Sequence, residues 1–371
     1  MTHMYRADQV GSLLRPHELL EARKRPGISH EELTALEDRY ILDLFARQKS
    51  AGFRIFTDGE LRRTGFMGDF YESVEGLSPE YELDRAWKGA PTGVAVASGV
   101  GAPGGAVVAK LRQTKRLTKH EVDFLKRHAP GDIKMTLPTA NQFPAIAYKK
   151  GVSERAYPTY SEFLWDIVPI MKREIEALVA EGIQYIQIDA PRYSYYIDPK
   201  WRHFVQDEMG VDPDTALDEA IRVDNACIEG VNRQGVTLAM HLCRGNNRSQ
   251  WYAEGGYDLI AEKLFNQLNV DRFLLEYESE RAGTFDALRF VPRSKSIVLG
   301  LVSSKLPALE PADDLIRRID EASRYVPLEN LAVSPQCGFA STMEGNLLSE
   351  EDQWRKLQLV ADTARRVWQD A

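Results

Sequence analysis

A histidine and a cysteine stand two residues apart at the end of one apolar stretch of the chain. The stretch Thr237–Met240 has the composition of a buried strand and runs directly into His241-Leu242-Cys243. Side chains two residues apart in an extended chain point to the same side. The imidazole and the thiol can therefore reach one point, and imidazole with thiolate is a typical pair of zinc ligands. The alternative is a core histidine beside a buried thiol, and further ligands are needed to decide.

Length and composition indicate a globular chain of one large α/β barrel or two ordinary domains. The chain has 371 residues, of which 43% are hydrophobic and 27% charged. Its net charge of −8 does not indicate binding to nucleic acid or to an anionic membrane. No apolar stretch is long enough to span a bilayer and no secretory signal begins the chain, so we expect a cytoplasmic protein. Three cysteines cannot all pair with one another, and Cys227 lies in a helical pattern typical of core.

Eight short apolar runs recur along the chain, and most are separated by stretches with helical periodicity. This alternation predicts a (β/α)8 TIM barrel, with residues 1–371 as a single catalytic domain. An open doubly wound sheet is the alternative, but no G-x-G-x-x-G follows the first run. The predicted strands are residues 6–10, 52–57, 132–138, 183–188, 236–240, 272–275, 296–302 and 331–333, and the clearest predicted helices are residues 161–181, 213–233 and 350–368.

The segment 61–131 between the second and third predicted strands is too long for a plain loop of such a barrel. Within it, Thr92–Ala109 alternates small and β-branched residues with many glycines, which is typical of a hairpin. Thr118–His128 has the pattern of a helix, and Thr118 with Glu121 predicts a capping box at its start. We therefore predict an inserted hairpin–helix segment over one end of the barrel.

Further groups with chemical potential follow the other predicted strands, at the rim where barrel enzymes carry their chemistry. Cys337 follows the last predicted strand and is a third zinc-type ligand beside His241 and Cys243. A fourth ligand is Glu276, and Glu278 competes with it because both share one side of an extended chain. The other polar residues at predicted strand ends are Ser12, Glu60, Asp189 and Lys305.

Six short segments spread over the whole chain carry a resemblance to a known family. They are Val10-Gly11-Ser12, Asp58-Gly59-Glu60-Leu61-Arg62-Arg63, Ile186-Gln187-Ile188-Asp189, His241-Leu242-Cys243, Leu275-Glu276 and Pro335-Gln336-Cys337-Gly338. In order and spacing they resemble the zinc-containing catalytic barrel of cobalamin-independent methionine synthase, in its shorter stand-alone form. The resemblance covers one barrel, so we expect no counterpart of the additional N-terminal barrel of the full-length enzyme.

The resemblance implies roles for seven residues and one metal. The implied Zn²⁺ ligands are His241, Cys243, Glu276 and Cys337, and the residues implied to hold homocysteine are Ser12, Glu60 and Asp189. One departure concerns the methyl donor. The family pattern Asp-Glu-Pro after the fourth strand is Asp189-Ala190-Pro191 here, so methylfolate, a methylated corrinoid protein and a small methylated metabolite all remain open.

The ligand set determines the chemistry that such a centre would supply. Zinc with two thiolates, a carboxylate and a neutral imidazole carries a net charge of about −1, which makes it a poor activator of water. It still binds an incoming thiol as the nucleophilic thiolate. Glu60 and Asp189 would hold the substrate ammonium group by charge-assisted hydrogen bonds and position the thiol. The expected activity is zinc-dependent methyl transfer to homocysteine, of the 5-methyltetrahydropteroyltriglutamate–homocysteine methyltransferase type.

Two other functions remain open from the sequence. The first is alkyl transfer from an epoxide to coenzyme M, whose sulfonate would be repelled by Glu60 and Asp189 and would require an arginine. Arg244 and Arg281 are equally consistent with gripping an anion and with a structural role. The second is a non-catalytic zinc-binding barrel, which metal removal would unfold, whereas a catalytic centre would leave a folded apoprotein.

Overall fold

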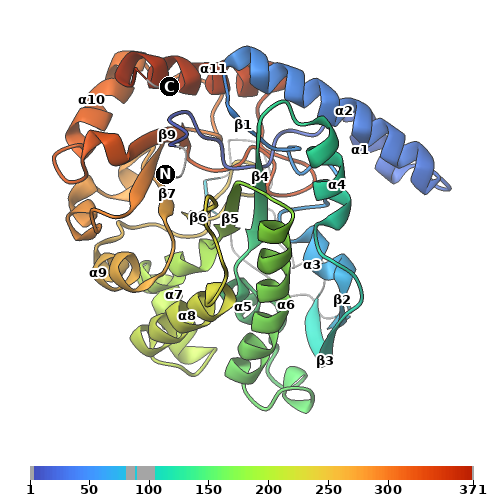
Figure 1. Ribbon diagram of the computed structural model, residues 1–371. Helices are drawn as coiled ribbons and strands as arrows, with labels where there is room; N and C mark the ends of the chain where they lie inside the picture. The colour runs from blue at the N-terminus through green and yellow to red at the C-terminus, as the bar shows by residue number, and fades with distance from the viewer. Residues whose placement is uncertain (1–3, 81–87, 90–104, 370–371) are drawn as a thin grey trace.

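Seven parallel strands form one curled sheet at the centre of the molecule, in the order β1-β4-β5-β6-β7-β8-β9. The computed structural model describes residues 4–80, 88–89 and 105–369. Helices lie around the outside of the sheet, and the chain alternates between strand and helix along most of its length (Figure 1). The strands are β1 (Ile55–Phe56), β4 (Asp132–Pro138), β5 (Tyr185–Asp189), β6 (Thr237–Leu242), β7 (Arg272–Glu276), β8 (Ser296–Val302) and β9 (Leu331–Pro335).

The helices follow most of the strands and cover the outer face of the sheet. Strands β5, β6, β7 and β9 are buried along their whole length, as parallel strands are when both faces of the sheet are covered. Within the described part of the chain, none of the helices combines the length and apolar character that crossing a bilayer requires. The α-helices are α1 (His17–Lys24), α2 (His30–Ala51), α3 (Gly68–Ser73), α4 (Lys119–His128), α5 (Pro144–Ala147), α6 (Tyr160–Ala180), α7 (Pro199–Asp207), α8 (Pro213–Ile228), α9 (Asp258–Gln267), α10 (Ala312–Ala322) and α11 (Glu350–Val367).

Residues 6–10 do not form the regular strand that the sequence predicts, so this prediction is wrong. Ala7 forms only an isolated parallel bridge to Val333 of β9, where the Asp8 N–H donates to the Val333 carbonyl at 2.9 Å. On the other side, the Leu13 N–H donates to the carbonyl of Gly59, just after β1, at 3.0 Å. The chain from Ala7 to Leu13 therefore reaches from β9 to the loop after β1, although too few ladder hydrogen bonds form for a strand.

A small second core fills the inside of the curled sheet, because alternate residues of each strand face inward. It also encloses an ion pair: the Lys134 ammonium lies 2.8 Å from Asp8 Oδ1, and both side chains are fully buried. The pair ties β4 to the N-terminal segment. The inner core consists of Tyr5, Val10, Ile55, Tyr185, Ala239, Leu274, Val298 and Ala332.

An antiparallel hairpin interrupts the alternation between β1 and β4. Its strands are β2 (Val74–Ser78) and β3 (Ala106–Gln113), with a bulge between Glu75 and Leu77. The predicted hairpin Thr92–Ala109 lies mostly outside the described residues. The part that is described, from Ala106 on, pairs with β2 and not with a neighbouring segment of the predicted hairpin.

The helix predicted at 118–128 forms as α4, but the predicted capping box is wrong. The Thr118 side chain makes no cap hydrogen bond. Its hydroxyl donates instead to Glu174 of α6 at 2.6 Å, and Glu121 pairs with Arg63 at 2.6 Å. The Thr118–Glu174 hydrogen bond and the Glu121–Arg63 ion pair are both charge-assisted and buried, so each is stronger than a capping hydrogen bond.

Candidate metal centre

Three potential metal ligands meet at the carboxyl end of the sheet. His241 is near the end of β6, Cys243 follows that strand directly, and Cys337 lies two residues beyond β9. All three side chains are buried, and one ligand atom of each lies within 4.8 Å of the others. This group of one nitrogen and two sulfur atoms can bind a metal ion.

The electrostatics of the group fit a cation. Neither ring nitrogen of buried His241 has a hydrogen-bond partner among the described residues. The hydrogen bond from Cys243, together with His241 and Lys305 nearby, holds the pKa of the Cys337 thiol well below its usual range. The same contact with Cys337, added to burial, raises the pKa of Cys243. The pair therefore already favours one thiolate, and a metal ion would supply the partner that the imidazole lacks.

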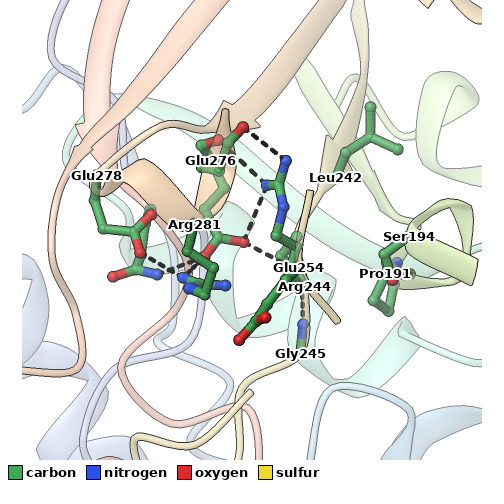
Figure 2. A network of polar contacts seen from close by, with 12 residues as sticks. Pro191, Ser194, Leu242, Arg244, Gly245, Glu254, Glu276, Glu278 and Arg281 are labelled. Carbon is green, nitrogen blue, oxygen red and sulfur yellow. Dashed lines mark hydrogen bonds and ion pairs between the residues drawn. The ribbon is translucent and has the colours of Figure 1, made fainter. Parts of the chain in front are cut away.

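The predicted fourth ligand, Glu276, lies outside this group of three in the structure. Its Oε1 accepts a hydrogen bond from Arg281, and its Oε2 accepts the backbone N–H of Arg244 at 2.8 Å (Figure 2). Its Oε1 also accepts from Gln336 Nε2 at 2.7 Å. Burial alone would raise the pKa of Glu276, but Arg281 and Arg244 lower it to about 2. Glu278, the competing candidate, contacts Arg281 and donates no ligand atom to the group either.

The two arginines that were candidates for an anion grip are structural in this molecule. The Arg244 guanidinium is buried and donates to the carbonyls of Gly255 at 2.6 Å and Ala282 at 3.0 Å. Arg281 donates to Glu276 and Glu278. Both guanidinium groups are therefore already engaged by the protein.

The remaining predicted site residues line one cavity with the three ligands. The cavity has a volume of about 220 Å³ and lies at the carboxyl end of the sheet. The structure therefore brings together every predicted site residue except Glu276. The predicted residues along the cavity wall are Ser12, Glu60, Asp189, His241, Cys243 and Cys337.

Two buried carboxylates face this cavity with spare hydrogen-bonding capacity. Glu60 Oε1 accepts from the Thr136 hydroxyl at 2.8 Å, while Oε2 has no partner among the described residues. Glu60 also has a φ of 56°, a left-handed conformation that is strained for a non-glycine residue and often marks a functional site. Asp189 accepts from Gln187 at 2.8 Å, and burial, partly offset by His241, raises its pKa to about 7. A bound cation would satisfy both acids.

Ser12 is fixed by the loop that also carries Cys337. The Phe339 N–H donates to the Ser12 carbonyl at 2.8 Å. Gly338 packs so closely that a Cβ there would lie 1.9 Å from the Ser12 Oγ. The N-terminal segment and the loop after β9 thus form one wall of the site.

A second group of possible metal ligands, Asp69, His120 and Glu121, is already neutralised. Arg63 lies between the two acids, 2.7 Å from Asp69 and 2.6 Å from Glu121. The guanidinium occupies the position in which a cation would bind. We therefore read this group as an ion-pair network that holds α4 against the loop after β1.

Two residues near the site were missed by the sequence reasoning. Lys305, which the sequence placed at a predicted strand end without assigning it a role, is buried and donates to Asn246 Oδ1 at 2.7 Å and to the Gly245 carbonyl at 3.1 Å. Asn246 in turn donates to the Gly338 carbonyl at 2.8 Å, so this chain links the loops after β6, β8 and β9. Arg192 also lines the cavity. Their positions just after predicted strand ends were the signal available in the sequence.

Comparison with known proteins identifies the family. Residues 150–354 match the catalytic domain of the cobalamin-independent synthase family, and this range includes all three ligands of the candidate metal centre. The chain belongs to this family. The family is one of methyltransferases.

Similar proteins span nearly the whole chain. The uncharacterized protein YxjH of Bacillus subtilis is 37% identical, over 98% of this chain and 95% of its own. A methionine synthase of Pyrococcus abyssi is 24% identical, over 88% of this chain and 82% of its own.

Two solved structures have a similar fold. One, from Listeria monocytogenes and described as a candidate vitamin-B12 independent methionine synthase, has a TM-score of 0.75 and 28% identity and covers 99% of each chain. The other, a B12-independent methionine synthase from Shewanella sp. W3-18-1 in complex with selenomethionine, has a TM-score of 0.74 and 20% identity and covers 98% of each chain.

Proposed function

We propose that this protein is a zinc-dependent methyltransferase that transfers a methyl group to the thiol of homocysteine. The observation that carries the proposal is the meeting of His241, Cys243 and Cys337 in a cavity that also presents Glu60 and Asp189. A soft, sulfur-rich metal site suits thiol activation, and the acids suit an amino-acid ammonium group. Membership of the methionine synthase family supports the same reaction.

The residues of the site fit zinc. His241, Cys243 and Cys337 would hold the ion, which when bound would keep an incoming thiol ionised. We propose Glu276 as the fourth ligand in preference to Glu278. The Glu276 carboxylate already contacts the backbone of the residue after Cys243, whereas the Glu278 carboxylate contacts Ser279 and Arg281.

The other residues of the cavity would position the substrate. Glu60 and Asp189 would accept hydrogen bonds from its ammonium group, and Ser12 would contact the same molecule. The sulfur would then attack the methyl carbon in line, forming the S–C bond as the bond to the donor breaks and the donor leaves with the electron pair. The donor would be a methylfolate, a methylated corrinoid protein or a small methylated metabolite.

We further propose that segment 6–10 takes the place of an eighth strand and closes the sheet into a TIM barrel. Its bridge to β9 supports this arrangement, as does the hydrogen bond that Leu13, further along the chain, donates to Gly59 in the loop after β1. On this proposal, residues 1–371 form a single catalytic domain, residues 61–131 are an insertion within it, and the protein acts in the cytoplasm.

Alkyl transfer to coenzyme M is the second candidate, because one observation favours it. A sulfonate would require an arginine in the cavity, and Arg192 is present there. Glu60 and Asp189 disfavour the sulfonate, and for this reason homocysteine remains the first choice.

Zinc X-ray absorption with and without a thiol tests the proposal. The resting centre should show two sulfur ligands, from Cys243 and Cys337, and homocysteine should raise the number to three. Coenzyme M is the parallel sample: a rise with coenzyme M alone would support the second candidate. An unchanged sulfur count with both thiols would contradict thiol activation altogether.

A further inference from the structure

The guanidinium of Arg192 is a buried cation in the cavity, and no anion among the residues that the structure describes pairs with it. The residue lies in the 3-10 turn Pro191–Tyr196 after β5, is only 2% exposed, and lines the cavity of the metal centre. None of its three guanidinium nitrogens has a hydrogen-bond partner among the described residues. Arg63 and Arg244 are as deeply buried, yet each donates to several protein acceptors. A buried charge without a partner is costly, so an unpaired one points to a ligand.

Aromatic rings hold this guanidinium in place. Its Cζ lies 4.5 Å from the ring centroid of Tyr195 and 5.5 Å from that of Tyr252. The Tyr252 hydroxyl donates to the Pro191 carbonyl at 3.0 Å, which fixes the turn that carries Arg192. Aromatic faces stabilise a cation but use none of its N–H donors, so the planar edge of the guanidinium remains available.

Arg192 and Asp189 place opposite charges in the same cavity without pairing. They are three residues apart, both line the cavity, and the acid accepts its hydrogen bond from Gln187. No ion pair joins them in the described part of the chain. The cavity therefore offers separate positions for a positive and a negative group of a ligand.

We propose that Arg192 binds a carboxylate group of a substrate through paired N–H donors. The proposal rests on the function proposed above and adds a specificity-determining residue to it. The carboxylate belongs either to the thiol amino acid or to the methyl donor. Two N–H groups of a guanidinium match the two oxygens of a carboxylate in geometry and charge.

The test compares Arg192→Met with the wild-type zinc protein. Methionine is of similar length and apolar, and no protein hydrogen bond is lost, so the melting temperature without ligand should stay equal or rise. The first arm measures binding of homocysteine and of 3-aminopropane-1-thiol, which lacks the carboxylate. A homocysteine affinity at least about tenfold weaker in the variant, with unchanged binding of the carboxylate-free thiol, assigns the carboxylate to the thiol substrate.

The second arm tests the methyl donor as the source. Wild-type protein saturated with homocysteine is compared in sodium acetate and in sodium chloride of equal ionic strength. A melting temperature raised by acetate in the wild type but not in Arg192→Met assigns the anion site to the second substrate. A third outcome is that acetate raises the melting temperature of the wild type but not of Arg192→Met, while homocysteine does not bind at all. That result would support the anion site at Arg192 and contradict homocysteine as the thiol substrate.

A matched control separates binding from folding. Arg202→Met removes a guanidinium of α7 that donates to the Tyr196 carbonyl and to Asp214, each at 3.1 Å. This variant should lose stability and keep wild-type ligand binding. Loss of stability in Arg192→Met with full ligand binding in both arms would overturn the proposal and leave Arg192 a purely structural residue.

Discussion

The Glu276 carboxylate accepts the backbone N–H of Arg244 at 2.8 Å, and so joins the end of β7 to the residue directly after Cys243. The same carboxylate accepts from Arg281 and from Gln336, the residue before Cys337. One buried acid therefore contacts the chain next to both cysteines. Glu276 therefore connects the backbone beside the candidate metal ligands to Arg244 and Arg281, whose contacts with it are drawn in Figure 2.

Replacing this acid should destabilise the fold. Glu276→Ala leaves Arg244 and Arg281 buried without their shared carboxylate, and we expect a loss of about 3 kcal/mol or more in the free energy of unfolding. Urea denaturation measures the effect. Arg244 is 1% exposed, so solvent cannot replace the lost partner.

Glu276→Gln separates the structural role from the proposed ligand role. The amide keeps the shape of the carboxylate but is a poor metal ligand. If Glu276 is the fourth ligand, zinc affinity should fall in this variant and remain at the wild-type value in Glu278→Gln. Equal zinc affinity in both variants would remove Glu276 from the metal site.

Cys337→Ser should lose zinc while the fold remains. The serine hydroxyl does not ionise to match the thiolate that His241 and Lys305 favour at this position. Metal analysis should show zinc well below one ion per chain, with an unchanged circular dichroism spectrum. Asp189→Asn is the control, since it should keep its zinc and bind homocysteine more weakly. A full zinc complement in Cys337→Ser would exclude that residue as a ligand.

A buried acid away from the metal group gives a pH-dependent prediction. Burial raises the pKa of Asp224 from 3.8 to about 6, although Thr139 and Tyr193 donate hydrogen bonds to it. The folded state therefore holds this proton more tightly than the unfolded chain. Stability contributed by Asp224 is fully present below pH 4 and is lost as pH rises through about 6, by about 3 kcal/mol in total.

Asp224→Asn removes this dependence. The difference in unfolding free energy between wild type and variant should be small at pH 4, where both side chains are neutral, and should move in favour of the variant by pH 7. Denaturation curves over this range measure it. A difference that does not change with pH would show that Asp224 has the same affinity for its proton in the folded and unfolded states.

Asp224 is also relevant to the cavity, because it holds the turn that carries Arg192 against the loop after β4.

The sequence was sufficient for those parts of the fold that local pattern determines. The strand 132–138 and the helix at 161–181 formed almost as predicted, because buried runs and helical periodicity are properties of short segments. The meeting of His241, Cys243 and Cys337 also followed from pattern, since parallel strands bring their carboxyl ends to one edge.

The failures concern contacts between segments far apart in the sequence. Thr118 lost its capping role to Glu174. The predicted inserted hairpin is present as β2 and β3, but β2 lies outside the range Thr92–Ala109 in which the sequence placed it. Residues 6–10 contact β9 without the ladder of a strand. Lys305 and Arg192 were missed as site residues because burial and the presence or absence of partners are properties of the assembled fold.

The packing of Ser12 against Gly338 has a consequence for biosynthesis. The wall of the site joins two segments far apart in the sequence, and Cys337 is the last of the three candidate ligands in chain order. While the ribosome is still making β9, the nascent chain has only His241 and Cys243 of the three ligands. All three side chains can bind one metal ion together only after translation has passed Cys337, so the complete group does not exist while β9 is still being made.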